Sequence, residues 1–321
     1  MSATSDQLID RRRLQRRLSL WRVLAFVALA VAILAIGWRA VGLRGAGAVV
    51  PHIARLSIGG LITGDDDTIK LIDGLTDSNA SGVLVDIGSP GGTVTGSERV
   101  YKALRRLSAK KPTVAVVKDL AASGAYIAAL GTDQIVAEDN ALVGSIGVLF
   151  QFPNFAGALD KLGVKVETIK SSPLKASPNG LEPTTPEAKA AIDALVVDTY
   201  GWFKGLVKSR RNMNDDQLAA VVDGRVFTGR QGLALHLVDA LGEEQTAIKY
   251  LHEKRNVPDK LPVYDWKRKT GFAMKLFGSA GDVARFVGLG SLAGVLDEAG
   301  HLAEARSMEG LVAVWEPSPG T

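Results

Sequence analysis

The sequence TVAVVKDLAASGAYIAALG at residues 113–131 decides the fold of this chain. Residues 113–117 form a continuous apolar run typical of a buried strand, and residues 125–130 form a short apolar helix. Ser123 lies where the predicted strand turns into the predicted helix, and small residues on both sides let a substrate backbone come close. The amide of Gly124, the first of the helix, can point at a developing oxyanion there. This setting is typical of a nucleophile, although a lone serine at a helix start is more often an N-cap.

A second motif, DIGSPGG at residues 86–92, follows another apolar run and precedes a predicted helix over residues 97–107. Gly91 and Gly92 leave backbone amides uncovered, so one of them can be a second oxyanion donor. Pro-Gly-Gly is also what an ordinary strand-to-helix turn contains. The motif therefore gains meaning only beside the serine turn.

A general base is harder to identify. No carboxylate in a supporting motif accompanies any of the four histidines, His52, His236, His252 and His301. A lysine can act instead where burial lowers its pKa and frees a lone pair for proton abstraction. Lys170 and Lys175 lie in a loop that follows a predicted strand over residues 164–169. The residues alone leave both lysines open as the base.

These motifs occur together, and in the same order, in a known family. The chain resembles the signal peptide peptidase A family, which are serine–lysine membrane proteases of the Clp-protease/crotonase fold group, over roughly residues 50–255. The matching pieces are SPGG at 89–92, AASG at 121–124, GSIGV at 144–148, the loop 172–178, DGRVFTGR at 223–230 and the stretch 232–242.

The resemblance implies five site residues: the nucleophile Ser123, the general base Lys175, the lysine-orienting Ser145, and the oxyanion-hole amides of Gly124 and Gly92. It favours Lys175 over Lys170, and it implies no cofactor and no metal. The implied substrates are cleaved signal peptides and other apolar peptides. As a short, single-copy form, the chain is expected to be a homo-oligomer whose active sites are shared between subunits.

Strand-like and helix-like runs alternate along the chain, which predicts an α/β fold with a largely parallel sheet. The expected strands lie at residues 53–58, 83–87, 113–117, 134–137, 146–150 and 164–169. The resemblance implies Clp-protease/crotonase-like repeated β-β-α units, preceded by one N-terminal transmembrane helix. Catalytic groups then belong at the carboxyl ends of the strands. A long helix over residues 186–211 has an apolar stripe that is either core or a subunit interface.

The N-terminal segment predicts a membrane anchor. Residues 23–38 are uncharged, and more arginines precede than follow them, which places the N-terminus in the cytoplasm. The alternative is a cleaved signal peptide with a small-residue site at 46–48. The expected organisation is a cytoplasmic basic arm at 1–22, a transmembrane signal anchor at 23–43, a protease domain at 44–260, and a C-terminal extension at 261–321 that forms an interface or lies near the membrane.

Composition excludes several classes of protein. The 321 residues contain no cysteine, which excludes disulfides and thiol catalysis. The net charge of +4 comes from the first 44 residues, which hold eight arginines and two aspartates, so the remainder carries −2. A mildly acidic domain argues against nucleic-acid binding.

The sequence thus predicts a single-pass protease of the bacterial inner membrane with its catalytic domain on the periplasmic side. The alternatives are a peptidase of the same family that acts on membrane or misfolded proteins, a crotonase-like acyl-CoA hydrolase, and a non-enzymatic membrane scaffold.

Overall fold

A computed structural model describes residues 50–267, the backbone of residues 311–314, and residues 21, 24, 26–29 and 31. The chain divides into two compact units, Met1–Pro51 and His52–Thr321. Among the described residues, no helix has the length and apolar character that crossing a membrane requires. The predicted basic arm and most of the predicted anchor at 23–43 lie outside the described residues.

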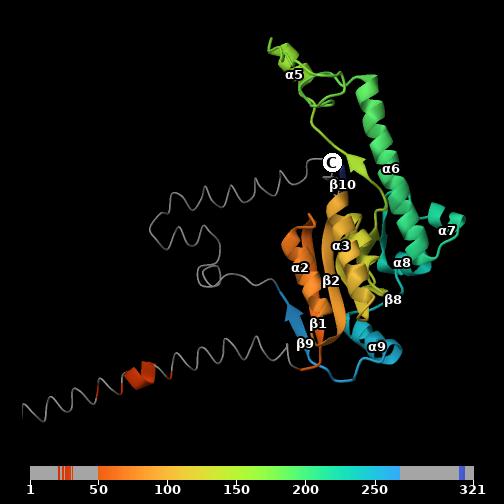
Figure 1. The fold of residues 1–321 in the computed structure, drawn as a ribbon. Helices are drawn as coiled ribbons and strands as arrows, with labels where there is room; N and C mark the ends of the chain where they lie inside the picture. Colours follow the sequence, from red (N-terminus) through yellow and green to blue (C-terminus); the bar gives the residue numbers. More distant parts are fainter. Residues whose placement is uncertain are drawn as a thin grey trace, which may run out of the picture. The chain divides into compact units, whose positions relative to one another are not determined.

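The second unit is built on a ten-stranded sheet in which parallel pairs predominate (Figure 1). Four strands lie side by side and pair in parallel: β1 (His52–Ile62), β2 (Ala80–Thr93), β3 (Thr113–Ala122) and β4 (Gln134–Ala137). The α/β fold with a largely parallel sheet, predicted from the alternation of elements, is confirmed.

Shorter strands extend this sheet. Those in parallel pairs are β5 (Leu142–Gly144) beside β3, β8 (Ala240–Leu241) beside β4 and β9 (Val263–Trp266) beside β1. Those in antiparallel pairs are β7 (Val226–Thr228) beside β5, and β10 (Leu311–Val314) beside both β2 and β6 (Leu149–Phe150). Residues 263–266 and 311–314 of the predicted C-terminal extension therefore take part in the sheet.

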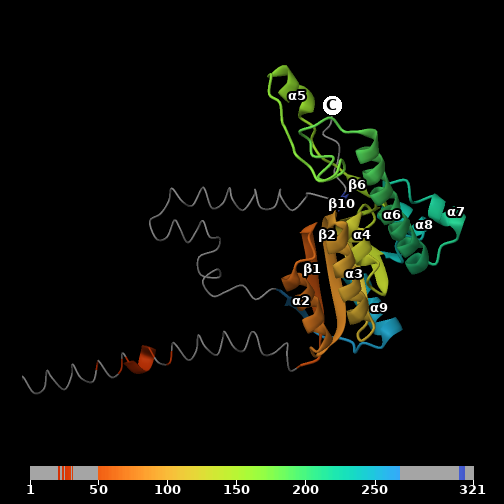
Figure 2. The ribbon, with the colours of Figure 1, turned by 45° about the horizontal axis from the view of Figure 1, so that its top comes forward.

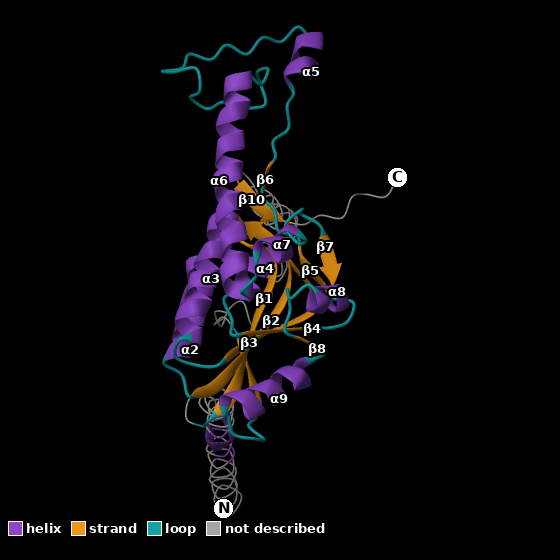
Figure 3. Cartoon of the chain, turned by 90° about the vertical axis from the view of Figure 1, so that its right-hand side faces the viewer, coloured by secondary structure: helices purple, strands orange, loops and turns teal. Residues whose placement is uncertain are grey.

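Helices cover both faces of the sheet (Figure 3). One face carries α2 (Asp66–Thr76), α3 (Val94–Ser108), α4 (Gly124–Ala129) and α6 (Pro186–Arg211), and the other carries α9 (Glu244–Arg255). Because side chains alternate along a strand, Val83, Val85 and Ile87 of β2 join the larger core, while Leu84 packs in the smaller core under α9. Burial on both faces explains why the strands read as continuous apolar runs.

Two short helices begin with complete capping boxes. Asn214 caps α7 (Asp215–Ala219) and exchanges hydrogen bonds with Gln217, and Thr228 caps α8 (Gly229–Ala234) in the same way with Gln231. These reciprocal bonds satisfy backbone N–H groups at the start of each helix.

An arm between β6 and α6 lies beyond the end of the sheet (Figure 2). It spans residues 151–185 and includes α5 (Ala156–Lys161). The strand predicted over residues 164–169 is wrong: these residues form no strand, and Val164 and Ile169 are exposed. An apolar alternation forms a strand only where a neighbouring strand accepts its backbone hydrogen bonds, and none pairs with this segment among the described residues.

The apolar side chains of α6 are buried near one end of the helix and exposed nearer the other. Phe203 and Val207, near its C-terminal end, are fully buried in the core. Leu195 and Val197, nearer its N-terminal end, are 51% and 67% exposed. One end of α6 is therefore fixed to the sheet layer, and the other holds the arm.

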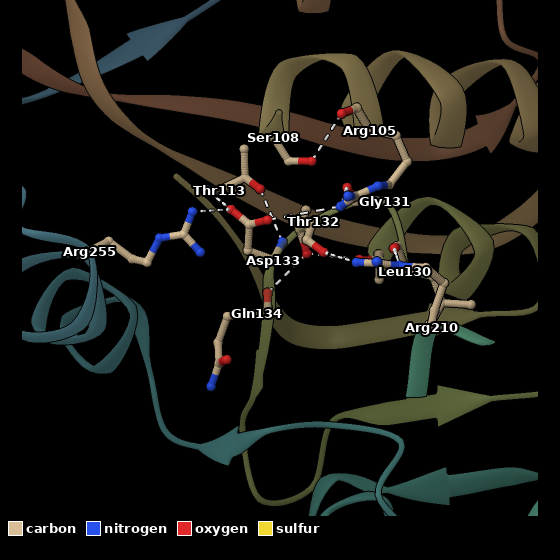
Figure 4. A network of polar contacts seen from close by, with 11 residues as sticks. Arg105, Ser108, Thr113, Leu130, Gly131, Thr132, Asp133, Gln134, Arg210 and Arg255 are labelled. Atoms are coloured by element: carbon tan, nitrogen blue, oxygen red, sulfur yellow. Dashed lines mark hydrogen bonds and ion pairs between the residues drawn. The ribbon is translucent and has the colours of Figure 1, made fainter. Parts of the chain in front are cut away.

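Arg210, at the end of α6, binds the chain that leaves α4. The Arg210 guanidinium donates to the carbonyls of Leu130 and Thr132, at 2.8 and 2.9 Å. Figure 4 shows this contact beside Asp133, whose carboxylate accepts a hydrogen bond from the Thr113 N–H at 3.0 Å. The end of α4 is thus tied to α6 and to the start of β3.

Replacement of Arg210 by methionine keeps the aliphatic stem and removes both hydrogen bonds. We expect the free energy of unfolding to fall by about 2 kcal/mol, because the bonds are charge-assisted and the carbonyls they satisfy lie at a helix end. Arg99→Met, which breaks an exposed pair with Asp66, is the control and should cost less than about 0.5 kcal/mol. Denaturant unfolding measures both; equal losses would contradict the role given to Arg210.

Candidate active site

Ser123 lies at a strained turn between β3 and α4. Its backbone has φ 56° and ψ −116°, a conformation that residues with a side chain rarely adopt, and its side chain is 1% exposed. A serine on a sharp strand-to-helix turn of this kind is the geometry of a nucleophile elbow. Its side chain makes no N-cap hydrogen bond, so the N-cap interpretation fails.

Ser145 directly follows the neighbouring strand β5, as Ser123 directly follows β3. In the parallel pairing of β3 with β5, Ala122 lies opposite Gly144, so Ser123 and Ser145 each follow a paired position. The Ser123 N–H donates to the Gly144 carbonyl at 2.7 Å. Ser145 also has a positive φ, 51°, and is 6% exposed. The structure therefore brings these two predicted residues together.

The motif at the end of β2 lies on the other side of β3. Ser89 pairs with Ala121, two residues before the nucleophile candidate. The Gly91 N–H is held by the Ser89 hydroxyl at 3.1 Å, which removes Gly91 as an oxyanion donor and leaves Gly92 as the candidate in this turn. A Cβ on Gly92 would lie 2.0 Å from the Ile62 carbonyl oxygen, so only glycine fits there.

Strand β10 occupies the edge of β2 that β3 leaves free. As β3 turns away at Ser123, Ala313 of β10 pairs antiparallel with Gly92, and Val312 pairs with Leu149 of β6. An extended polypeptide segment therefore fits between β2 and β6, next to the turn that holds Ser123.

Tyr126 anchors the helix that follows the turn. Its ring is fully buried, and its hydroxyl donates to the Leu237 carbonyl at 2.7 Å. Burial raises the pKa of this hydroxyl well above its usual range, so Tyr126 stays a neutral donor. Sequence reasoning missed this contact, because it joins residues that lie far apart in the chain.

Lys175 lies on the arm and not against the two serines. Its side chain is exposed, and its N–H donates to the Ser172 carbonyl at 3.1 Å. Because Ser123 and Ser145 are buried on the sheet, a single copy of the chain does not supply the desolvated lysine that a serine–lysine pair needs.

Lys170 differs from Lys175 in one decisive contact. Its ammonium lies 2.6 Å from a carboxylate oxygen of Glu182, and its side chain is only 14% exposed. An ion pair stabilises the charged form of a lysine, which is the form that cannot accept a proton. In the part of the chain that the structure describes, no ion pair reaches Lys175.

Other candidate features lie away from this turn. His52 is at the start of β1, at the opposite end of the parallel strands, and His252 is on α9. A cavity of about 340 Å³ between β1 and α2 is lined by Ile62, Leu71 and Trp266 among others, and includes none of the five predicted site residues. Within residues 50–267, no group of three or more histidine or carboxylate side chains could hold a metal ion.

Comparison with known proteins identifies the family of this chain. Residues 105–258 match the model of peptidase family S49. Three similar proteins are "Putative protease MJ0651" of Methanocaldococcus jannaschii (36% identity; 59% of this chain, 61% of that protein), "Putative protease slr0021" of Synechocystis (35%; 65% and 76%) and "Putative signal peptide peptidase SppA" of Enterococcus faecium (31%; 66% and 62%).

The nucleophile turn, Ser145 and Lys175 all fall inside the matched segment. The fold defines an α/β protein whose largely parallel sheet presents a buried serine at a strand end. More narrowly, the chain belongs to peptidase family S49. The matches span about three fifths of the Methanocaldococcus and Enterococcus proteins.

Gly92→Ala tests the turn against a control within the same motif. The added Cβ must displace either β2 or the Ile62 carbonyl, so we expect peptidase activity to fall about 100-fold, the effect of losing one oxyanion donor. Gly88→Ala should keep near-normal activity and thermal stability, because nothing lies within 4 Å of its Cβ. Loss of activity in both variants would contradict a special role for Gly92.

Proposed function

We propose that this chain is a membrane-anchored serine endopeptidase that uses Ser123 and Lys175 to degrade cleaved signal peptides and other apolar peptides. The pairing of β10 with the Gly92 edge is the observation that carries the proposal, because it is a polypeptide strand lying beside the serine turn. A substrate that binds as an added strand gains backbone hydrogen bonds whatever its sequence. Such a slot suits a peptide better than an acyl-CoA thioester.

In the proposed mechanism, the Ser123 hydroxyl attacks the scissile carbonyl while the neutral amine of Lys175 takes its proton. The amides of Gly124 and Gly92 stabilise the oxyanion of the tetrahedral intermediate. The protonated lysine then gives its proton to the leaving amine, and water hydrolyses the acyl-enzyme by the same route in reverse. Ser145, beside Ser123, holds the lysine amine in line.

The two halves of this dyad come from different subunits of a homo-oligomer in our proposal. Lys175 lies on an exposed arm that reaches beyond the sheet, whereas Ser123 is buried at the sheet's end. Large apolar side chains are exposed along the arm and the adjoining half of α6: Phe155, Leu162, Val164, Val166, Ile169, Leu174, Leu181, Leu195 and Val197. Apolar surface gathered in this way marks an interface, and a second copy of the chain provides both cover for the arm and the missing lysine.

The location we propose is the bacterial inner membrane, with residues 23–43 as an uncleaved anchor and the catalytic unit on the periplasmic side. The apolar run and the arginines before it support this topology. The Enterococcus relative's printed name supports signal peptides as substrates, since a cleaved signal peptide is apolar and stays close to the membrane. We assign the sheet to the Clp-protease/crotonase type of repeated β-β-α units.

Ser123→Ala should abolish peptidase activity and labelling by a fluorophosphonate probe, while the protein keeps its oligomeric state and its melting temperature. Lys175→Ala should be nearly as damaging, because a serine without a neutral base is a weak nucleophile. Hydrolysis of an apolar reporter peptide measures both. Substantial turnover by purified Ser123→Ala would refute the assignment of the nucleophile.

Mixed oligomers test the sharing of sites. Ser123→Ala subunits supply an intact lysine and Lys175→Ala subunits an intact serine, so co-assembled mixtures should recover activity that neither variant has alone. The recovered activity should rise and fall with the mixing ratio and be greatest near equal amounts. If the variants co-assemble and every mixture stays inactive, the dyad lies within one chain.

A further inference from the structure

The loop that presents Lys175 is closed at its base by an ion pair. Lys170 precedes the loop and Glu182 follows it, and the Lys170 ammonium lies 2.6 Å from a Glu182 carboxylate oxygen. Their side chains are 14% and 29% exposed, less than those of most ion pairs in the structure. The pair therefore joins two segments twelve positions apart and leaves Lys175 between them.

Glu182 collects hydrogen bonds from both sides of the loop. The hydrogen bond from Lys170, with smaller contributions from Thr168 and Asn179, holds the pKa of Glu182 below its usual range. The Asn179 carboxamide oxygen also accepts the N–H groups of Leu181 and Glu182, at 3.0 and 3.1 Å. The ion pair and the bond to its backbone N–H together hold Glu182 in place.

The returning end of the loop is docked on the segment before α5. The Phe155 N–H donates to the Gly180 carbonyl at 2.7 Å, and the Asn154 side chain donates to the Glu182 carbonyl at 3.3 Å. Gly180 has φ 77°, and a Cβ there would lie 2.3 Å from the Pro153 carbonyl oxygen. The base of the loop is thus ordered, although its tip around Lys175 is exposed.

We propose that Lys170 and Glu182 are positioning residues for the general base, because their ion pair sets where the loop carries Lys175. The proposal rests on the proposed function of Lys175. Neither residue touches the substrate; each acts through the shape of the loop. Displacement of a catalytic group by about 1 Å can cost on the order of 100-fold in rate, so a modest change at the loop base is enough to slow turnover.

The pair has a second effect, which concerns the choice of lysine. Glu182 binds the Lys170 ammonium at 2.6 Å, so this nearby lysine is held at the loop base and does not move into the site. The charged pair is also neutral as a whole, and it adds no net charge to the loop that bears the base.

The test compares Lys170→Met, Glu182→Gln, Lys170→Arg and the charge-reversed double variant Lys170→Glu/Glu182→Lys, all in the full-length oligomer. We expect Lys170→Met and Glu182→Gln each to lower kcat by roughly 10- to 100-fold, with KM within about twofold of wild type. The reason is that the base is displaced in both variants while the edge of β2 that binds the peptide is untouched. Lys170→Arg and the charge-reversed variant should recover most of the lost kcat. Lys249→Met, which breaks an exposed pair with Glu253 on α9, is the matched control and should leave kcat unchanged.

Three results decide the proposal. Wild-type kcat in Lys170→Met or Glu182→Gln would overturn it, and so would a charge-reversed variant no better than the single ones. Because a damaged fold would lower kcat too, tryptic cleavage after Lys175 is followed in a Ser123→Ala background with and without Glu182→Gln. We expect Glu182→Gln to speed this cleavage at an unchanged melting temperature. An unchanged cleavage rate would also count against the proposal. If Lys175→Ala keeps full activity, the proposed dyad fails instead, and the two failures are distinct.

Discussion

The hydrogen bond from the Ser123 N–H to the Gly144 carbonyl, 2.7 Å long, is the contact on which the candidate site depends. A serine at φ 56° is strained by about 1–3 kcal/mol, so its surroundings must hold it in place. This bond extends the parallel pairing of β3 and β5 by one residue past Ala122. The same contact that keeps the strained turn therefore also sets Ser145 beside Ser123.

The remaining restraints on this turn come from distant parts of the chain. Tyr126 fixes the first turn of α4 to the Leu237 carbonyl, and Arg210 holds the carbonyls at the end of α4. The Ser145 N–H donates to the Arg225 carbonyl at 2.9 Å. The turn at Ser123 and its neighbour Ser145 are thus held by α6, by Arg225 just before β7 and by the region after α8, which makes the candidate site a product of the whole second unit.

Local patterns in the sequence predicted the parts of the fold that local chemistry determines. The apolar runs 83–87 and 113–117 are strands, and the bounds of the helix Pro186–Arg211 agree with the prediction. The strand predicted over residues 164–169 failed because an isolated alternation has no strand to pair with. The two-to-four-residue strands β5 and β7–β10 were not identified, since so few residues show no periodicity and only tertiary pairing makes them strands.

The candidate site also has one part that local sequence could predict and another that depends on tertiary structure. The position of Ser123 at a strand-to-helix turn could be predicted from its neighbours, but its closeness to Ser145 depends on the register between β3 and β5. The resemblance to a known family favoured Lys175 over Lys170 without a physical reason. The structure adds the ion pair between Lys170 and Glu182, and no sequence pattern shows that these side chains, twelve residues apart, meet.

The two lysines of the arm have opposite surroundings, since Lys170 is paired and largely buried and Lys175 is exposed. A lysine acts as a base only when its surroundings favour the neutral amine, and a bound carboxylate favours the ammonium. Lys170 pairs with the Glu182 carboxylate within its own chain. Lys175 is exposed to water on the arm. It loses this contact with water only where another surface covers the arm. If a second subunit buries it beside Ser145 and Ser123, the assembly itself removes the water that keeps the amine protonated, and activity then depends on assembly. The exposed lysine of a free subunit would not act as a base, whereas the desolvated lysine of the oligomer would. Peptides would then not be hydrolysed before the protease is fully assembled.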